Sequence, residues 1–195
     1  KLRSVIYMPI LNNALAGAAG GGAADFKIER SLRFNRDDDA HLSRTFAAGN
    51  RKTWTWSGWI KLGREQTGGS SNRYTLFECT NNFGASGNPY GILNIVSGFL
   101  GFGEASGGAY TTAQFRDHSA WYHVVAAMDT TQSTAADRLK LYVNGVQYAH
   151  TGYTFGPSAD TAINQSGIQH NIGREENSGI FEADLLMAEV HFIDG

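Results

Sequence analysis

Short runs of strand-forming residues, separated by Gly, Asn and Ser, follow one another through most of this 195-residue chain. In Thr53–Lys61 the alternation is strict at first, and it predicts Trp54, Trp56 and Gly58 on one face of a strand. Asn144-Gly145 lies between two apolar runs and supplies the positive φ angles of a type I′ hairpin turn. Turn signals about every ten residues, without a long amphipathic helix, predict an all-β antiparallel sandwich.

The predicted strands are residues 31–34, 41–43, 53–61, 74–79, 91–96, 99–102, 121–129, 138–144, 146–148, 168–174 and 183–193. We expect the first two to pair with each other through a turn at Asn35–Asp39, which is rich in acidic residues. Cys79 ends one of these runs and is expected to be a small buried side chain.

Composition excludes several classes of protein. Gly occurs 24 times and aromatic residues make up 12% of the chain, as a sandwich with many turns requires. The formal net charge of -2 argues against a nucleic-acid partner, since phosphate binding needs a basic surface. A single cysteine excludes an internal disulfide, and no apolar run is long enough to insert into a membrane.

Residues 1–25 differ from the rest and are predicted to form an N-terminal arm ahead of a sandwich domain at 26–195. Pro9 suits a first helical turn, Leu11, Leu15 and Ala18 fall on one helical face, and Gly20–Gly22 would act as a flexible hinge.

The arm has three interpretations: a secretory signal, a frayed tail, or a docking arm that orders against another chain. Pro9, Asn12 and Asn13 interrupt the apolar core that a signal needs, so the docking arm is preferred. Its expected contact residues are Pro9, Ile10, Leu11 and Leu15. Whether the natural chain starts at Met8 or is processed is left open.

Five segments together carry a resemblance to a known family. The ordered set Trp54–Lys61, Trp121–Val125, Leu141–Gly145, Ile172–Arg174 and Ala188–Phe192 resembles the laminin-G/pentraxin-like group of concanavalin A-type jelly rolls. The likeness extends over Phe26–Gly195, which is the whole predicted domain. It implies a concanavalin A-like antiparallel jelly-roll sandwich.

Three further segments narrow the resemblance. Met8–Gly17, Ser31–Asn35 and Phe192–Gly195 are similar to laminin-G-like virion proteins of marine and cyanobacterial tailed phages. That likeness implies a virion structural protein of the tail-fibre or host-recognition type, anchored by its arm and displaying a lectin-like domain outside the cell. The implied partners are other virion proteins and a host-surface glycan, and virion symmetry favours a homo-oligomer. In such proteins the chain usually continues beyond the matching Phe-Ile-Asp-Gly.

Catalysis is not expected. A retaining glycosidase of this fold would place carboxylates at alternate positions of a strand, in the pattern Glu-x-Asp-x-Glu. Glu182-Ala183-Asp184 supplies the first two of these acids but lacks the third. We expect those acids in a solvated turn, and Glu175-Glu176 in an exposed loop. No nucleophile elbow or phosphate loop is present. A concanavalin-fold glycoside hydrolase remains one alternative, and a capsid decoration protein without glycan affinity is the other.

Glycan binding would use exposed aromatic rings with amide groups around them. The candidate ligand residues are Asn82, Phe83, Asn88, Tyr90 and Tyr153. The alternative is that these aromatic rings cap the core.

Calcium is the one cofactor that the resemblance suggests, because laminin-G and pentraxin relatives often bind Ca²⁺ through loop carboxylates. Asp37, Asp38 and Asp39 could supply hard oxygen ligands. They lack the interleaved spacing of a dedicated calcium loop, so a solvated acidic turn is the competing interpretation.

Overall fold

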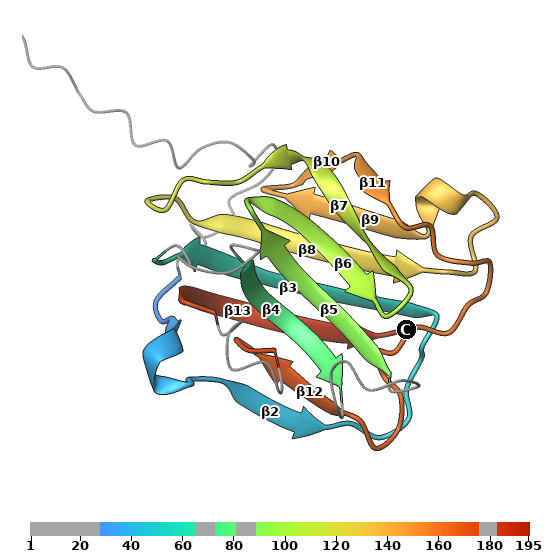
Figure 1. The fold of residues 1–195 in the computed structure, drawn as a ribbon, viewed down its shortest axis with the longest axis horizontal. Helices are drawn as coiled ribbons and strands as arrows, with labels where there is room; N and C mark the ends of the chain where they lie inside the picture. Colours follow the sequence, from blue (N-terminus) through green and yellow to red (C-terminus); the bar gives the residue numbers. More distant parts are fainter. Residues whose placement is uncertain (1–27, 65–72, 81–88, 176–182) are drawn as a thin grey trace, which may run out of the picture.

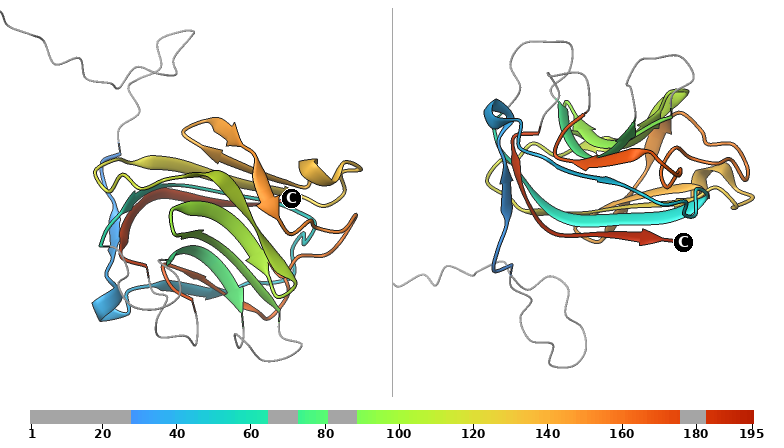
Figure 2. Two further views of the ribbon diagram at one scale, coloured as in Figure 1. Left: turned by 45° about the horizontal axis from the view of Figure 1, so that its top comes forward. Right: turned by 90° about the horizontal axis from the view of Figure 1, so that it is seen from below.

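The computed structural model of the protein describes residues 28–64, 73–80, 89–175 and 183–195. Two antiparallel sheets face each other across the core (Figures 1 and 2). In spatial order, the six-stranded sheet consists of β1 (Leu32–Phe34), β13 (Leu185–Asp194), β3 (Thr53–Leu62), β8 (Tyr122–Asp129), β9 (Leu139–Val143) and β10 (Val146–Tyr148). The seven-stranded sheet consists of β11 (His150–Gly152), β7 (Gly107–Gln114), β6 (Phe99–Glu104), β5 (Tyr90–Val96), β4 (Arg73–Thr80), β12 (Gln169–Ile172) and β2 (Leu42–Thr45).

Helical structure in the described ranges is limited to two short 3₁₀ turns, η1 (Arg36–Asp38) and η2 (Ala135–Asp137). Within those same ranges, neither turn has the length or apolar character needed to span a bilayer. The predicted all-β sandwich is therefore confirmed.

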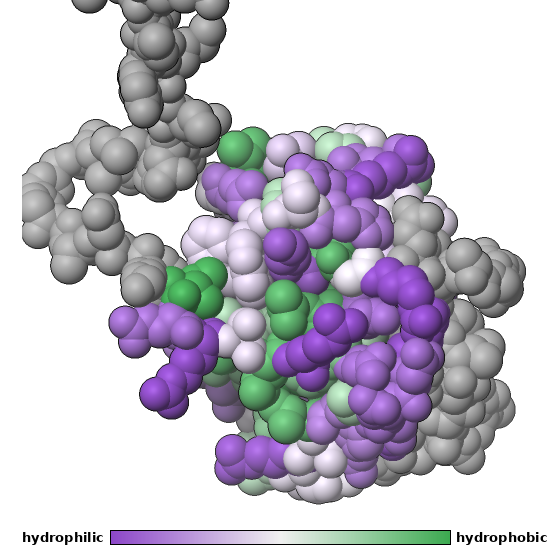
Figure 3. Space-filling view, turned by 90° about the vertical axis from the view of Figure 1, so that its left-hand side faces the viewer, coloured by the Kyte–Doolittle hydropathy of each residue, from purple (hydrophilic) through white to green (hydrophobic). Residues whose placement is uncertain are grey.

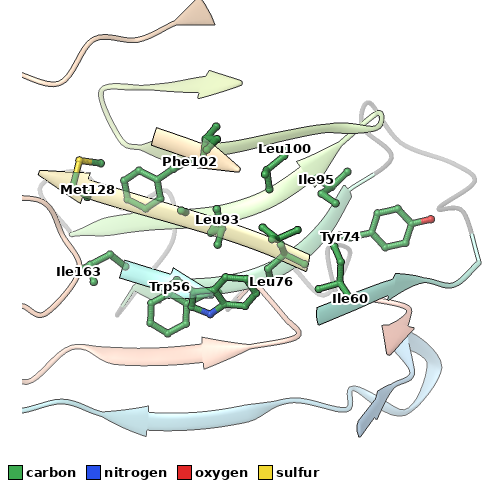
Figure 4. Close-up of a cluster of buried hydrophobic side chains, with 14 of the residues drawn as sticks. Trp56, Ile60, Tyr74, Leu76, Leu93, Ile95, Leu100, Phe102, Met128 and Ile163 are labelled. Carbon is green, nitrogen blue, oxygen red and sulfur yellow. The ribbon is translucent and has the colours of Figure 1, made fainter. Parts of the chain in front are cut away.

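Strand β3 buries every second residue, as its alternation predicts. Trp54 and Trp56 face the opposite sheet and are almost fully buried. Figure 4 shows Trp56 and Ile60 of β3 opposite Leu93 and Leu76 of the second sheet. The hydrophobic effect of joining these two inner faces drives the formation of the sandwich.

Gly58 lies on the same buried face of β3 as Trp56. A Cβ at this position would come within 2.9 Å of Trp56 Cη2 and 3.2 Å of Val190 Cγ2. We expect Gly58→Ala to lower the free energy of unfolding by about 1–3 kcal/mol, because Trp56 is fully buried and has little room to move. Urea denaturation would measure the loss. Gly156→Ala is the matched control, since its Cβ would meet Ala159 at an ordinary 3.6 Å; equal effects of the two variants would contradict the prediction.

The Asn144-Gly145 hairpin is confirmed. Asn144 and Gly145 have φ angles of 51° and 78°, and β9 pairs with β10 through Val143 and Val146. The side chain of Asn144 also accepts a 2.8 Å hydrogen bond from the backbone N–H of His123 on β8. The turn is thereby tied to the neighbouring strand.

The predicted pairing of residues 31–34 with 41–43 is wrong. Strand β1 pairs with β13 in the six-stranded sheet, whereas β2 pairs with β12 in the seven-stranded sheet. The turn η1 carries the chain from one sheet to the other. Phe34, which precedes it, is buried against the core, whereas all four residues of β2 are exposed. Strands β7 and β11 were also not predicted, since Gly107, Gly108 and Gly152 weaken their strand character.

The N-terminal arm, with Pro9, Ile10, Leu11 and Leu15, lies outside the described residues, and so does the expected boundary at residue 26. Both stay predictions.

Candidate functional site

An open hollow at one end of the sandwich combines an aromatic ring with charged and amide side chains. Its volume is about 370 Å³, within the range of small-ligand sites. We call it the Tyr90 hollow, and it is lined by Arg51, Pro89, Tyr90, Glu104, Ala105, Ser106, Asp160, Ala162 and Gln165. These residues come from the start of β5, the β6–β7 turn, the approach to β3 and the long connection before β12.

The walls of the Tyr90 hollow are braced by hydrogen bonds between distant segments. Arg51 Nε donates to the carbonyl oxygen of Thr161 at 2.7 Å, and the N–H of Thr161 donates back to the Arg51 carbonyl at 2.9 Å. Glu104 Oε1 accepts from the N–H of Ala162 at 2.8 Å. Arg51 Nη1 also lies 3.7 Å from Asp160 Oδ2. The site is therefore preorganised, which lowers the entropic cost of binding.

Two carboxylates and one guanidinium determine the charge of the hollow. Burial raises the pKa of Glu104, although the Ala162 N–H and the charge of Arg51 oppose that shift. Asp160 is about half exposed. When both acids are ionised, the three groups sum to one negative charge.

Tyr90 joins the hollow to a buried ionic cluster on its other side. Its hydroxyl donates to Glu175 Oε1 at 3.3 Å, and Arg73 Nη1 donates to Glu175 Oε2 at 2.7 Å. The Glu175 side chain is fully buried, and that burial raises its pKa even though Arg73 acts in the opposite direction. Burial likewise raises the pKa of the Tyr90 hydroxyl, which therefore stays protonated.

The cluster occupies the face of the seven-stranded sheet that points away from the core. On that face Asn171 Nδ2 donates to Glu78 Oε1 at 2.8 Å, and Gln169 Nε2 donates to Asn171 Oδ1 at 2.9 Å. The ring of Tyr110 lies over Gly101, where a Cβ would come within 2.2 Å of it. Polar groups buried this deeply need partners, and these hydrogen bonds supply several of them.

Residues 34–194 match the family described as the concanavalin A-like lectin/glucanases superfamily. The chain belongs to this superfamily. A comparison with curated proteins gave no match.

Solved structures share the fold at low sequence identity. Domains LG4-5 of the mouse laminin alpha1 chain are 13% identical, with a TM-score of 0.57 over 90% of this chain and 44% of that one. The enzymatically active domain of tailspike protein 2 of bacteriophage CBA120 is 12% identical, with a TM-score of 0.54 over 85% of this chain. Domain 4 of AbnA, a GH43 extracellular arabinanase from Geobacillus stearothermophilus in complex with arabinotriose, is 16% identical, with a TM-score of 0.54.

These structures differ in how much of their own length is matched. The superfamily domain described here spans 25% of the tailspike chain, 44% of the laminin chain and 77% of the arabinanase domain. At such identities the likeness shows the fold alone.

Of the predicted ligand residues, the two that the structure describes line different hollows. Tyr90 lines the Tyr90 hollow, whereas Tyr153 lies at a separate hollow of about 250 Å³ and packs edge-on against Phe155, with ring centroids 5.1 Å apart. Asn82, Phe83 and Asn88 lie outside the described residues. The ligand-binding roles of these five residues stay predictions.

The three aspartates proposed for calcium have other partners. Arg64 Nη2 donates to both carboxylate oxygens of Asp37 at 2.9 Å, and Arg174 Nη1 lies 3.1 Å from Asp39 Oδ2. Asp38 accepts a hydrogen bond from the side chain of Asn35. Within the described ranges, no group of three or more His, Cys, Asp or Glu side chains is placed to hold a metal ion. A calcium ion here would compete with Arg64 for Asp37 and with Arg174 for Asp39.

The predicted exposure of the other acids is wrong for the two that the structure describes, whereas Glu176 and Glu182 lie outside the described residues. Glu175, expected in an exposed loop, is 1% exposed, and Asp184, expected in a solvated turn, is 3% exposed. Asp184 Oδ1 accepts from Arg33 Nη2 at 3.4 Å, and its Oδ2 lies 3.5 Å from Arg64 Nε. Their arginine partners are far away in the sequence, so no local pattern indicated the burial.

Proposed function

We propose that this protein is a non-enzymatic, lectin-like domain that binds a glycan in the Tyr90 hollow. The observation that carries the proposal is the combination of one aromatic ring, Tyr90, with Asp160, Glu104, Arg51 and Gln165 around a braced, open hollow. Sugars are bound by an aromatic surface beneath the ring carbons and by carboxylate and amide groups that hydrogen-bond the hydroxyls. The arabinanase domain of the same fold, solved with arabinotriose, lends support.

The charge of the hollow favours a class of sugar. Because Glu104 and Asp160 outnumber Arg51, neutral or amino sugars fit better than sugars that carry a carboxylate. The hollow should therefore prefer neutral hexoses, pentoses and amino sugars to sialic or uronic acids.

The test is a glycan array, followed by titration calorimetry on the strongest neutral hit. We expect Asp160→Ala to weaken binding about tenfold or more, because it removes a charged hydrogen-bond partner of the sugar. Asp137→Ala is the matched control, since Asp137 is similarly exposed and forms an ion pair with Lys140 outside the hollow. No binding on the array, or equal affinity of both variants, would overturn the proposal.

Catalysis is not part of the proposal. Glu104 and Asp160, the two acids of the hollow, hold an N–H group and an arginine in place. Incubating the best array ligand with the protein should release no new reducing ends. Cleavage that is lost in Glu104→Gln would instead favour a glycoside hydrolase.

The proposed setting is a tailed-phage particle, in which this domain faces outward and recognises a host-surface glycan. Support comes from the fold shared with a phage tailspike. Mass spectrometry of purified particles should find the protein, and its absence from them would overturn this setting. Incorporation without glycan binding would favour a capsid decoration protein.

A further inference from the structure

An apolar groove of about 340 Å³ lies on the side of the sandwich where the sheet edges β1 and β2 approach each other. Its walls include Leu32 of β1, which is 55% exposed, and Leu42 of β2, which is 49% exposed. Phe34 and Met187, both buried, also line it. Figure 3 faces this side of the molecule and shows apolar residues gathered among hydrophilic ones.

Two large leucines at an open groove are costly to leave in water. Burying a leucine side chain removes apolar surface from water, so covering this groove would be favourable. Contiguous apolar patches with a polar rim usually mark an interaction site. Both adjoining strands are also sheet edges, which proteins commonly cover with another segment.

We propose that the apolar stretch Met8–Ala18 of the same chain packs into this groove. That stretch provides Ile10, Leu11 and Leu15, and residues 8–24 contain no charged side chain. The groove begins at Arg30 and Ser31, only a few residues after the arm. Gly20–Gly22 permits the chain to reverse, and so short a connection gives the arm a high effective concentration at the groove.

A second copy of the domain fits the groove less well. Arg30 and Glu189 both line the groove. In a symmetric pairing of two copies, both sets of these charged groups would have to leave water, which costs free energy even where they pair. The uncharged arm brings no further charge into the groove. The inference does not depend on glycan binding.

Cysteine cross-linking of the full chain tests the inference. Leu15→Cys combined with Leu42→Cys, treated in dilute solution with a short bismaleimide, should give an internally linked monomer. The natural Cys79 is 0% exposed and will not interfere. Leu15→Cys with Val146→Cys is the control, because Val146 is 55% exposed at the opposite edge of the six-stranded sheet.

The yields of linked monomer and linked dimer decide whether the arm packs into the groove. A high yield of linked monomer for Leu42→Cys and a low yield for Val146→Cys supports the inference. Adding Leu11→Asp should reduce the Leu42→Cys yield to that of the Val146→Cys control, whereas Asn12→Asp, off the apolar stripe, should not. Linked dimers would overturn the inference and favour packing between two copies of the chain. Equal yields of linked monomer at both positions would overturn docking of the arm altogether.

Discussion

Arg73→Met is expected to lower the free energy of unfolding by about 3–5 kcal/mol, because it leaves the buried Glu175 carboxylate without its cation. Glu175 is fully buried and receives a 2.7 Å hydrogen bond from Arg73. The intact ion pair adds little to the stability of the fold, since burying both charges is costly. Removing one partner is strongly destabilising, because the other charge stays buried and uncompensated. Urea denaturation at neutral pH would measure the loss.

Two further measurements make the Arg73 prediction specific. The double variant Arg73→Met/Glu175→Gln should recover much of the stability, since no buried charge remains. The loss in Arg73→Met should also shrink as the pH falls, because a protonated Glu175 needs no counter-ion. Lys140→Met breaks the exposed pair with Asp137 and should cost less than about 1 kcal/mol. A similar cost for Arg73→Met would contradict the prediction.

Acidification is expected to destabilise the protein through His170. Its ring is 2% exposed and stacks on Phe46, with ring centroids 4.1 Å apart. Nε2 accepts the N–H of Asn164 at 3.2 Å, and Nδ1 lies 3.0 Å from the Ile168 carbonyl oxygen, to which it donates. In the neutral ring both nitrogens are therefore engaged in hydrogen bonds, and a proton on Nε2 would break the bond to Asn164.

The sign and size of the pH effect follow from the pKa. Burial lowers the pKa of His170 from 6.5 to about 4 in the folded protein. Between these values the unfolded chain takes up a proton that the folded protein refuses, so stability falls as the pH falls from 6.5 to about 4. Each pKa unit corresponds to about 1.4 kcal/mol, which makes the full loss about 3 kcal/mol.

The comparison that isolates this effect is with His170→Gln, whose amide oxygen can still accept from Asn164. Glu104 and Glu175, with raised pKa values, shift stability in the opposite direction on acidification, and they do so equally in both proteins. The difference in unfolding free energy between the two proteins should therefore narrow by about 3 kcal/mol from pH 7 to pH 4. A constant difference would show that His170 does not cause the acid sensitivity.

Local features of the fold were predictable from the sequence. The alternation in β3 places Trp54 and Trp56 in the core, and Asn144-Gly145 turns the β9–β10 hairpin. Both depend on residues next to each other in the chain, where side-chain period and turn chemistry act directly. The buried Cys79 was predicted for the same reason.

The candidate site was predictable only in part. Tyr90 was singled out as an aromatic residue in a Gly- and Asn-rich loop. The other polar groups of the hollow, Arg51, Glu104, Asp160 and Gln165, come from three further segments that only folding brings together. No spacing in the sequence relates them.

Sequence alone determined most of the strands, though not the glycine-containing β7 and β11, and which face of β3 is apolar, because those properties follow from neighbours along the chain. Only the tertiary structure decided that β1 and β2 belong to different sheets, and that Glu175 is buried beside Arg73, 102 positions away. The physical reason is that burial and ion pairing depend on the register between distant strands. That register is set by the packing of the whole core rather than by any local pattern.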